Sequence, residues 1–211
     1  MTVTRKLQAA QTAAELKQAA LAVFERVGFL NAKITDITHE AGKAAGSFYT
    51  HFESKEALLE ALLADLLSEA DQTAADPAHS GDFGDWSAVR WHVRAYWQTY
   101  RAHAAVLRSL QEAAIVNERF AARLREMTEP DLRHFVEHLE QARAAGAQLP
   151  GDPMLTAFMI QSVMLTFTSQ WIDKGERGDL AAGGPDDEGI DTLTNFIYAA
   201  IHGPSGHEQS G

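Results

Sequence analysis

The segment from residue 34 to residue 55 constrains the fold of this chain more than any other. It contains two stretches with helical patterning, and Gly42 separates them. In the first stretch Ile34, Ile37 and Ala41 share one face, at the spacing of three and four residues that marks a buried helical stripe. Glycine takes the left-handed position after a helix without steric cost, so Gly42 is expected to end the first helix. The segment therefore predicts two short helices joined by a tight turn.

The second of these helices, which starts near Ala45, begins with small side chains. Ala45, Gly46 and Ser47 form a slim end that can enter the major groove of DNA and bring the backbone close to base edges. Three side chains that donate hydrogen bonds well to phosphate oxygens follow: Tyr49, His51 and Lys55. The pattern indicates a DNA-binding element.

The same segment reads AG-x-x-x-G-S-F-Y-x-H-F-x-S-K-E-x-L-L from Ala41 to Leu59. It closely resembles the DNA-binding domain of the TetR family of transcriptional repressors, over roughly residues 13–67. The resemblance implies an all-α chain, with an N-terminal three-helix helix-turn-helix domain and a C-terminal helical domain for ligand binding and dimerisation. The expected parts are 1–55 for DNA binding, 56–203 for the second domain, 54–75 for the helix that links them, and 204–211 for a disordered tail.

The resemblance also implies contacts with DNA. Residues expected at base edges or the nearby backbone are Thr35, Ala45, Gly46 and Ser47, and residues expected on phosphates are Tyr49, His51 and Lys55. The family usually has a valine and then a serine after the turn glycine, whereas this chain has Lys43 and Ala44. Losing a serine cap costs about 1 kcal/mol, and Lys43 can compensate by reaching DNA. A small residue is also usual where Lys33 stands.

The rest of the chain also has helical patterning and no strand-like alternation. Thr12 and Glu15 have the spacing of a capping box, so we expect the first helix to begin at Thr12. Further expected helices begin at the Ser54 cap, near Trp86, near His103, near Asn117 with a kink at Pro130, at Asp152-Pro153, and at Gly189. The sequence therefore predicts an all-α protein.

Composition and charge agree with a DNA-binding protein whose two ends differ. The chain has 211 residues, 45% of them apolar, a net charge of −11 and no cysteine, which excludes disulfides and cysteine-based zinc sites. Seven Lys and Arg and five Asp and Glu precede residue 56, so this end carries +2 and the remainder −13. DNA would meet the basic end. We expect a cytoplasmic protein, because the N-terminus has no secretory h-region and the uncharged segment 154–172 carries many polar residues.

The last two helices are expected to form a dimer interface, as the resemblance implies. A single helix-turn-helix makes few contacts, whereas two heads related by a two-fold axis read a palindrome. The interface residues expected are Phe167, Trp171, Ile190, Leu193, Ile197 and Ile201. The partners are then double-stranded operator DNA and a second copy of the chain.

A small-molecule effector is a third expected partner, because the family loses DNA affinity when a ligand binds. The candidates for lining its binding site are aromatic and flexible apolar side chains that face inward, with a few polar side chains to orient the ligand. They are Trp97, Tyr100, Asn117, Phe135, Phe158, Met159, Gln161, Phe167 and Trp171. The aromatic content favours an apolar or aromatic ligand. An activator or a ligand-independent regulator of the same family remains an alternative.

An enzyme is the remote alternative. His134, Glu137 and His138 match H-x-x-E-H, an inverted zinc-peptidase motif in which two histidines bind the metal and the glutamate acts as a base. Catalytic zinc needs a third protein ligand and an open cleft, and the sequence indicates neither. A structural or sensory metal site at these two histidines is a further alternative to two surface histidines. We expect no catalytic residues, no cofactor and no metal.

Overall fold

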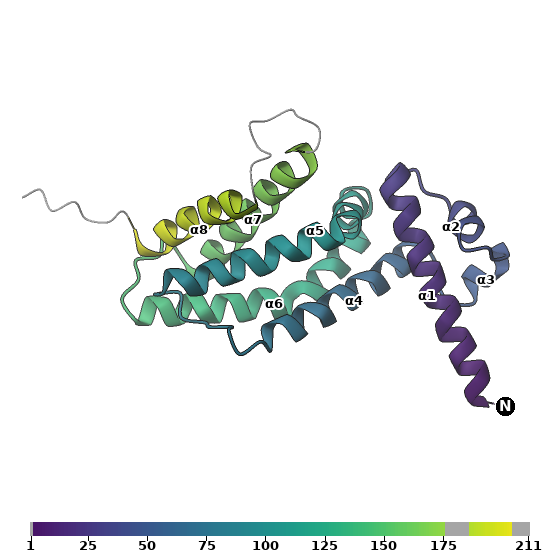
Figure 1. The fold of residues 1–211 in the computed structure, drawn as a ribbon, viewed down its shortest axis with the longest axis horizontal. Helices are drawn as coiled ribbons and strands as arrows, with labels where there is room; N and C mark the ends of the chain where they lie inside the picture. The colour runs from purple at the N-terminus through teal and green to yellow at the C-terminus, as the bar shows by residue number, and fades with distance from the viewer. Residues whose placement is uncertain (1, 176–185, 204–211) are drawn as a thin grey trace, which may run out of the picture. The chain divides into compact units, whose positions relative to one another are not determined.

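The computed structural model describes residues 2–175 and 186–203, and every regular element in them is an α-helix (Figure 1). The helices are α1 (Thr2–Val27), α2 (Ile34–Glu40), α3 (Ala45–Tyr49), α4 (Lys55–Ala74), α5 (Trp86–Val116), α6 (Glu118–Ala144), α7 (Pro153–Gly175) and α8 (Asp186–His202). The all-α prediction is confirmed. The expected tail, 204–211, lies outside the described residues.

Contacts divide the chain into two compact units. The N-terminal unit comprises 1–70 and 103–127, and the C-terminal unit comprises 71–102 and 128–211. This division differs from the boundary expected at residue 55, because α4, α5 and α6 each contribute residues to both units. The assignment of residues 1–55 to DNA binding stays a prediction.

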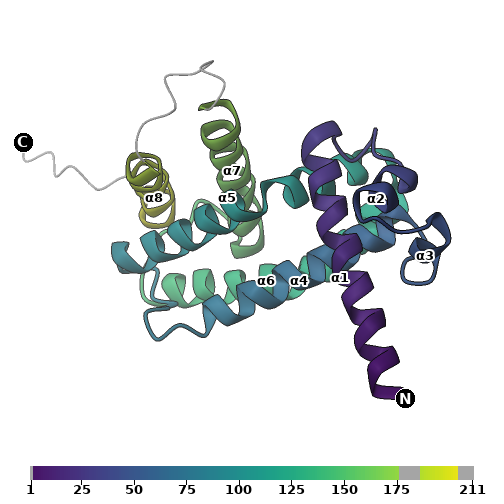
Figure 2. The same cartoon turned by 45° about the vertical axis from the view of Figure 1, so that its right-hand side comes forward.

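The N-terminal unit has one apolar core to which distant parts of the chain contribute. In Figure 2, α2 and α3 lie together beside α1. The buried side chains come from α1 to α4 and from the unit's parts of α5 and α6; among them are Leu16, Val23, Ile37, Phe48, Leu58, Leu59, Leu110 and Phe120. The leucine stripe of α4 therefore packs inward, as its spacing predicts, with Leu58 and Leu59 fully buried.

The start of α1 was predicted wrongly. The helix begins at Thr2, not at Thr12. Most of residues 5–11 are good helix formers such as Arg, Lys, Leu, Ala and Gln, which favour continuing the helix toward the N-terminus. Glu15 accepts a hydrogen bond from Gln11 Nε2 at 3.2 Å, one helical turn earlier, instead of closing a capping box with Thr12.

Other boundaries agree with the sequence. Ser54 Oγ accepts a hydrogen bond from the Ala57 N–H at 3.1 Å, so Ser54 caps α4 as expected. α5 is interrupted at His103, whose φ of −124° and ψ of 23° are not helical, near the expected start of a new helix. α6 passes through Pro130, where the predicted kink stays a prediction.

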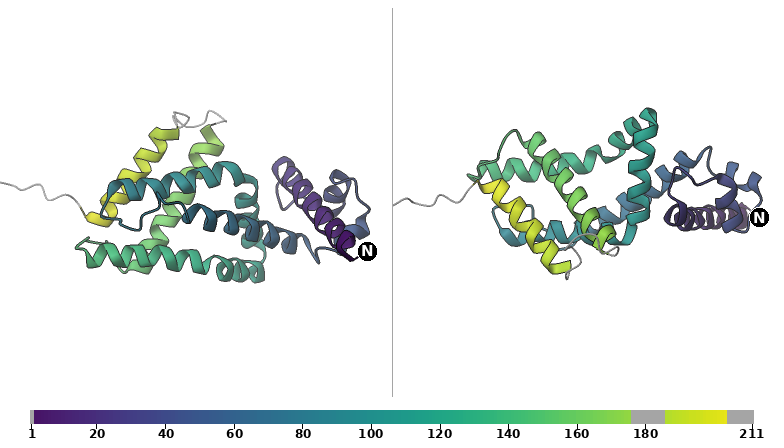
Figure 3. Two further views of the ribbon diagram at one scale, coloured as in Figure 1. Left: turned by 60° about the horizontal axis from the view of Figure 1, so that its bottom comes forward. Right: turned by 90° about the horizontal axis from the view of Figure 1, so that it is seen from above.

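The C-terminal unit buries one face of α8 and part of α7. The two helices lie next to each other, coloured yellow and green in Figure 3. Asp152 caps α7 by accepting a hydrogen bond from the Met154 N–H at 2.9 Å, and Pro153 is the first helical residue, as predicted. No helix within the described ranges is long and apolar enough to cross a membrane.

Candidate functional site

The turn between α2 and α3 has the geometry that the sequence predicts. Gly42 has a φ of +63°, a left-handed conformation that favours glycine. The Lys43 N–H donates to the Thr38 carbonyl at 2.8 Å and closes the turn across Gly42. At the start of α2, the Lys33 N–H donates to Asp36 Oδ2 at 3.1 Å, which satisfies an amide that the helix leaves free. These local bonds hold α2 and α3 as a helix-turn-helix pair.

Helix α3 presents the expected residues on its surface. Phe48 is fully buried and packs edge-on against Tyr49, with ring centroids 5.6 Å apart. Around this anchor, Ala45 and Gly46 are exposed, Ser47 is partly exposed, and 61% of Tyr49 is accessible to solvent. Of the other residues expected to contact DNA, Thr35 is exposed and His51 is partly exposed. The N-cap of α3 is Ala44, which makes no side-chain cap, as the missing serine implies.

Both of the expected DNA-binding lysines, Lys43 and Lys55, have partners within the N-terminal unit. Lys43 Nζ lies 2.6 Å from Glu15 Oε2 in an ion pair. Lys55 Nζ donates to the Phe29 carbonyl at 2.5 Å and the Ala32 carbonyl at 3.0 Å, and it lies 4.2 Å from the centre of the Phe29 ring. Burial lowers the pKa of Lys55. Both lysines thus fix the fold locally, a role that periodicity alone does not reveal.

Lys33 is a further cation beside the helix-turn-helix and is not among the expected DNA contacts. It immediately precedes α2 and is exposed. Within the described part of the chain, no ion pair holds its ammonium group. The sequence signal for Lys33 is its position, where the family usually has a small residue.

Three of the nine expected ligand-binding residues form an aromatic cluster in the C-terminal unit: Trp97, Phe167 and Trp171. The Trp97 ring centroid lies 6.2 Å from that of Phe167 and 6.1 Å from that of Trp171. A side chain at Gly189 would collide with Trp97, so glycine permits the close approach of α8. Tyr100 is buried nearby in sequence and donates a hydrogen bond from its hydroxyl to Asp173 Oδ2 at 2.9 Å.

The other expected ligand residues lie elsewhere. Phe158, Met159 and Gln161 are exposed on α7. Phe135 packs against Phe83, with centroids 5.4 Å apart. Asn117 belongs to the N-terminal unit and caps α6, where its Oδ1 accepts a hydrogen bond from the Phe120 N–H at 3.0 Å.

Among the described residues of the C-terminal unit, five buried polar atoms have no hydrogen-bond partner: the two ring nitrogens of His138, Trp97 Nε1, Thr156 Oγ1 and Thr168 Oγ1. An unpaired buried polar group costs about 1–3 kcal/mol. The two threonines were missed as site candidates. Their polarity within the otherwise apolar helix α7 is the sequence signal that marks them.

The residues expected at the dimer interface are mostly buried in the chain itself. Ile190, Leu193, Ile197 and Ile201 are each no more than 3% exposed, so they have no area left to bury against a second copy. Phe167 and Trp171 are half-buried. The large apolar side chains that remain exposed on α7 and α8 are Met154, Leu155, Phe158, Met159 and Phe196. Further along α7, an open depression of about 460 Å³ is lined by Ser162, Val163, Thr166, Phe167 and Gln170.

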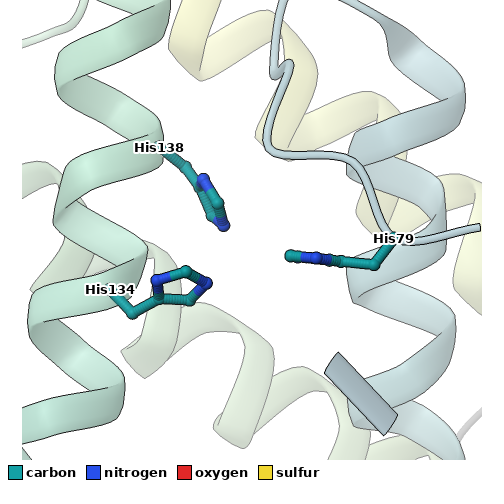
Figure 4. Close-up of side chains that lie close together, drawn as sticks. All are labelled: His79, His134 and His138. Carbon is teal, nitrogen blue, oxygen red and sulfur yellow. The ribbon is translucent and has the colours of Figure 1, made fainter. Parts of the chain in front are cut away.

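The histidines of the H-x-x-E-H motif lie in a cluster with a residue from another part of the C-terminal unit. His134 and His138 of α6 approach His79, which precedes α5 (Figure 4). Burial lowers the pKa of His138, and that of nearby His92, to about 4. No local sequence pattern joins His79 to the motif, because some fifty residues separate them.

Comparisons with known proteins match the helix-turn-helix and the whole fold. Residues 16–62 match the model for "Bacterial regulatory proteins, tetR family". The chain is 27% identical over 177 residues to the HTH-type transcriptional regulator EthR of Mycobacterium tuberculosis (strain ATCC 25618 / H37Rv), covering 81% of this chain and 77% of that protein.

Two solved structures have a similar fold. The fatty acid degradation regulator FadR from Bacillus halodurans has a TM-score of 0.71 and 17% identity, over 93% of this chain and 97% of that one. A transcriptional regulator from Saccharomonospora viridis in complex with choline also has a TM-score of 0.71, with 18% identity over 91% and 98% of the two chains. With the helix-turn-helix geometry, these findings show that residues 16–62 form a DNA-binding domain of the TetR family and that the chain has the fold of known transcriptional regulators.

Proposed function

We propose that this regulator is a repressor that binds a palindromic operator as a homodimer and is released by a small apolar or aromatic effector. The observation that carries the proposal is the exposed surface of α3, in which small residues and Tyr49 surround the buried anchor Phe48. A protein that binds operator DNA in a bacterial cell works in the cytoplasm, and none of these contacts requires catalysis.

The proposed DNA surface has two parts. Thr35, Ala45, Gly46 and Ser47 face base edges, and Tyr49 and His51 contact phosphates. Lys33 adds an exposed cation beside α2. Lys43 and Lys55 act mainly by holding the helix-turn-helix, because their ammonium groups already have intramolecular partners.

The proposed dimer surface is the exposed apolar face of α7 and α8. It consists of Met154, Leu155, Phe158, Met159 and Phe196. We propose these residues for the interface instead of the four expected side chains of α8 that are buried in the core. Contiguous exposed apolar side chains mark interaction sites, and Phe158 is 64% exposed. A charge at this position would be buried without a partner in the dimer, so Phe158→Glu is expected to yield monomers in analytical ultracentrifugation. A dimer that persists in Phe158→Glu would place the interface elsewhere.

The proposed effector site is built around the aromatic cluster of Trp97, Phe167 and Trp171. Aromatic walls with a few unpaired polar groups suit a small apolar ligand, and Trp97 Nε1 supplies such a group. The Saccharomonospora viridis neighbour was solved with a small molecule, choline. A ligand that favours one conformation of the C-terminal unit shifts the population, with α4 as the proposed link to DNA binding. A coupling of about 3 kcal/mol lowers operator affinity about 150-fold.

The experiment that tests the proposal is selection of DNA from a random duplex library, repeated at raised salt. A recovered palindrome supports the dimeric regulator, and the same selection with Ser47→Ala is expected to change the preference at one base pair. Weak binding without a motif, abolished by salt, would contradict sequence-specific recognition. The direction of regulation follows from a reporter gene placed behind the recovered site, where activation instead of repression would favour the alternative activator.

A further inference from the structure

Three histidines of the C-terminal unit come together at one point. His134 and His138 lie one turn apart on α6, and His79 lies in the loop before α5. Each offers a ring nitrogen, and these three atoms lie within 4.8 Å of one another. Figure 4 shows the three rings directed toward a common space. Three imidazoles from two separate segments thus converge as a set of nitrogen donors.

His138 is buried but both of its ring nitrogens lack a hydrogen-bond partner. Only 6% of the residue is exposed. A neutral imidazole has one N–H donor and one lone pair, and leaving each unsatisfied costs about 1–3 kcal/mol. Gly81 contributes to the tight packing, because a side chain there would collide with His138 Nδ1. The other nitrogen, Nε2, is then the one available to a ligand in the space that the three rings enclose.

A fourth histidine fixes the orientation of His79. His92 Nδ1 lies 2.9 Å from the Ala88 carbonyl, which can only accept, so Nδ1 carries the proton. Two ring nitrogens at hydrogen-bond distance need one donor and one acceptor, so His92 Nε2, opposite the protonated Nδ1, offers the lone pair. His79 Nε2 lies 3.1 Å from His92 Nε2 and donates to it. This leaves the lone pair of His79 on Nδ1, the arrangement in which a metal-binding histidine donates its other N–H to a neighbour.

We propose that His79, His134 and His138 bind a divalent first-row transition metal ion, with Zn²⁺ the best match to the ligands. Three imidazoles with an open fourth position are a known zinc arrangement, and all-nitrogen ligands do not favour Mg²⁺ or Ca²⁺. Tetrahedral zinc at about 2.0–2.1 Å from each nitrogen separates the nitrogens by about 3.3 Å. The rings must therefore draw closer when the ion binds, and the His134 side chain, 55% exposed, has room to rotate.

The surroundings favour a binding site over the hydrolase that the motif suggests. Glu137 Oε2 lies 3.6 Å from His134 Nδ1, where it can orient the ring from behind. Phe83, 1% exposed, packs on His138 and His92, and Trp91 packs on His79 with centroids 5.0 Å apart. These aromatic rings exclude water from the inner side of the site. A bound ion would tie the loop that carries His79 to α6 and stabilise the folded chain.

The test uses the full chain without a histidine tag, stripped of metal with a chelator and titrated with Zn²⁺ or Co²⁺. We expect one ion per chain by calorimetry, a higher melting temperature with Zn²⁺, and the visible absorption of tetrahedral Co²⁺. His134→Ala removes an exposed side chain and is expected to weaken binding at least about 10-fold. His138→Leu fills its own buried space and is expected to remove the Co²⁺ spectrum.

Two further variants separate the roles within the cluster. His92→Phe is expected to weaken binding about 10–100-fold while keeping the Co²⁺ spectrum, because His92 positions His79 and does not contact the ion. His39→Ala, an exposed histidine of the N-terminal unit, is the matched control and should bind as the wild type does. Absence of saturable Zn²⁺ or Co²⁺ binding would overturn the proposal, as would undiminished binding to His134→Ala and His138→Leu. This outcome is independent of operator binding, which the DNA selection tests separately.

Discussion

The side chain of Lys55 is expected to stabilise the N-terminal unit more than it contacts DNA. Its ammonium group donates to the carbonyls of Phe29 and Ala32 and lies over the Phe29 ring. Lys55→Met keeps most of the alkyl stem and removes these contacts. Hydrogen bonds from a charged group contribute about 1.5–3 kcal/mol each, and the cation–π contact about 0.5–1 kcal/mol. The desolvation that lowers the pKa of Lys55 offsets part of this, as does water that returns to the carbonyls.

We therefore expect Lys55→Met to lower the free energy of unfolding by about 2 kcal/mol. In a chain of this size that is about 4–8 °C in melting temperature, measured by far-UV circular dichroism. Lys33→Met is the matched control, because Lys33 is exposed and should leave the melting temperature unchanged.

Salt dependence of DNA binding separates the two roles. Each phosphate contact contributes about 0.9 to the slope of log affinity against log salt. Lys33→Met is expected to reduce the slope by that amount, and Lys55→Met to weaken DNA binding with the slope unchanged. Suppose instead that Lys55→Met had the melting temperature of the wild type and a salt slope smaller by about one. Lys55 would then be a phosphate contact, and the reasoning from its carbonyl partners would fail.

Three smaller predictions concern stability and are measured by urea denaturation. Gly42→Ala should destabilise by about 1–2 kcal/mol because alanine is strained at a φ of +63°; an unchanged midpoint would mean that the turn relaxes. Ser54→Ala should lose about 1 kcal/mol with the N-cap of α4, whereas Ser54→Asp should retain most of it. Leu59→Ala, at a fully buried position, should lose about 2–5 kcal/mol, and the half-buried Leu67 serves as the comparison, with a smaller loss expected.

The parts of the structure that the sequence predicts well are those determined by neighbouring residues. The turn at Gly42, the Ser54 cap and the start of α7 at Pro153 each depend on side chains and backbone within a few positions. Intrinsic propensity decided the start of α1, where a strong capping pattern at Thr12 lies inside a longer helix.

Features that depend on the partner of a helix face were harder to predict. The stripe of α8 that includes Ile190 and Ile197 was recognised as apolar, but spacing does not distinguish a face that meets the chain's own core from one that meets a second copy. Likewise, the sequence shows Lys55 as a cation but does not show the carbonyl groups that it bonds. It shows the two histidines of the motif but not that His79 lies beside them. These contacts join residues far apart in the sequence, which no local pattern encodes.

The core of the N-terminal unit has a consequence for how the protein is made. Leu16 to Leu66 contribute one part of that core, and Val106, Leu110, Ala113 and Phe120 contribute the other. During translation, the helix-turn-helix segment leaves the ribosome well before the side chains that complete its core. At 5–20 residues per second the intervening stretch of some fifty residues takes about 3–10 s to synthesise. Throughout that interval the nascent chain exposes the leucine face of α4 to chaperones and proteases, and a message truncated before residue 106 would yield a head with an unfinished core.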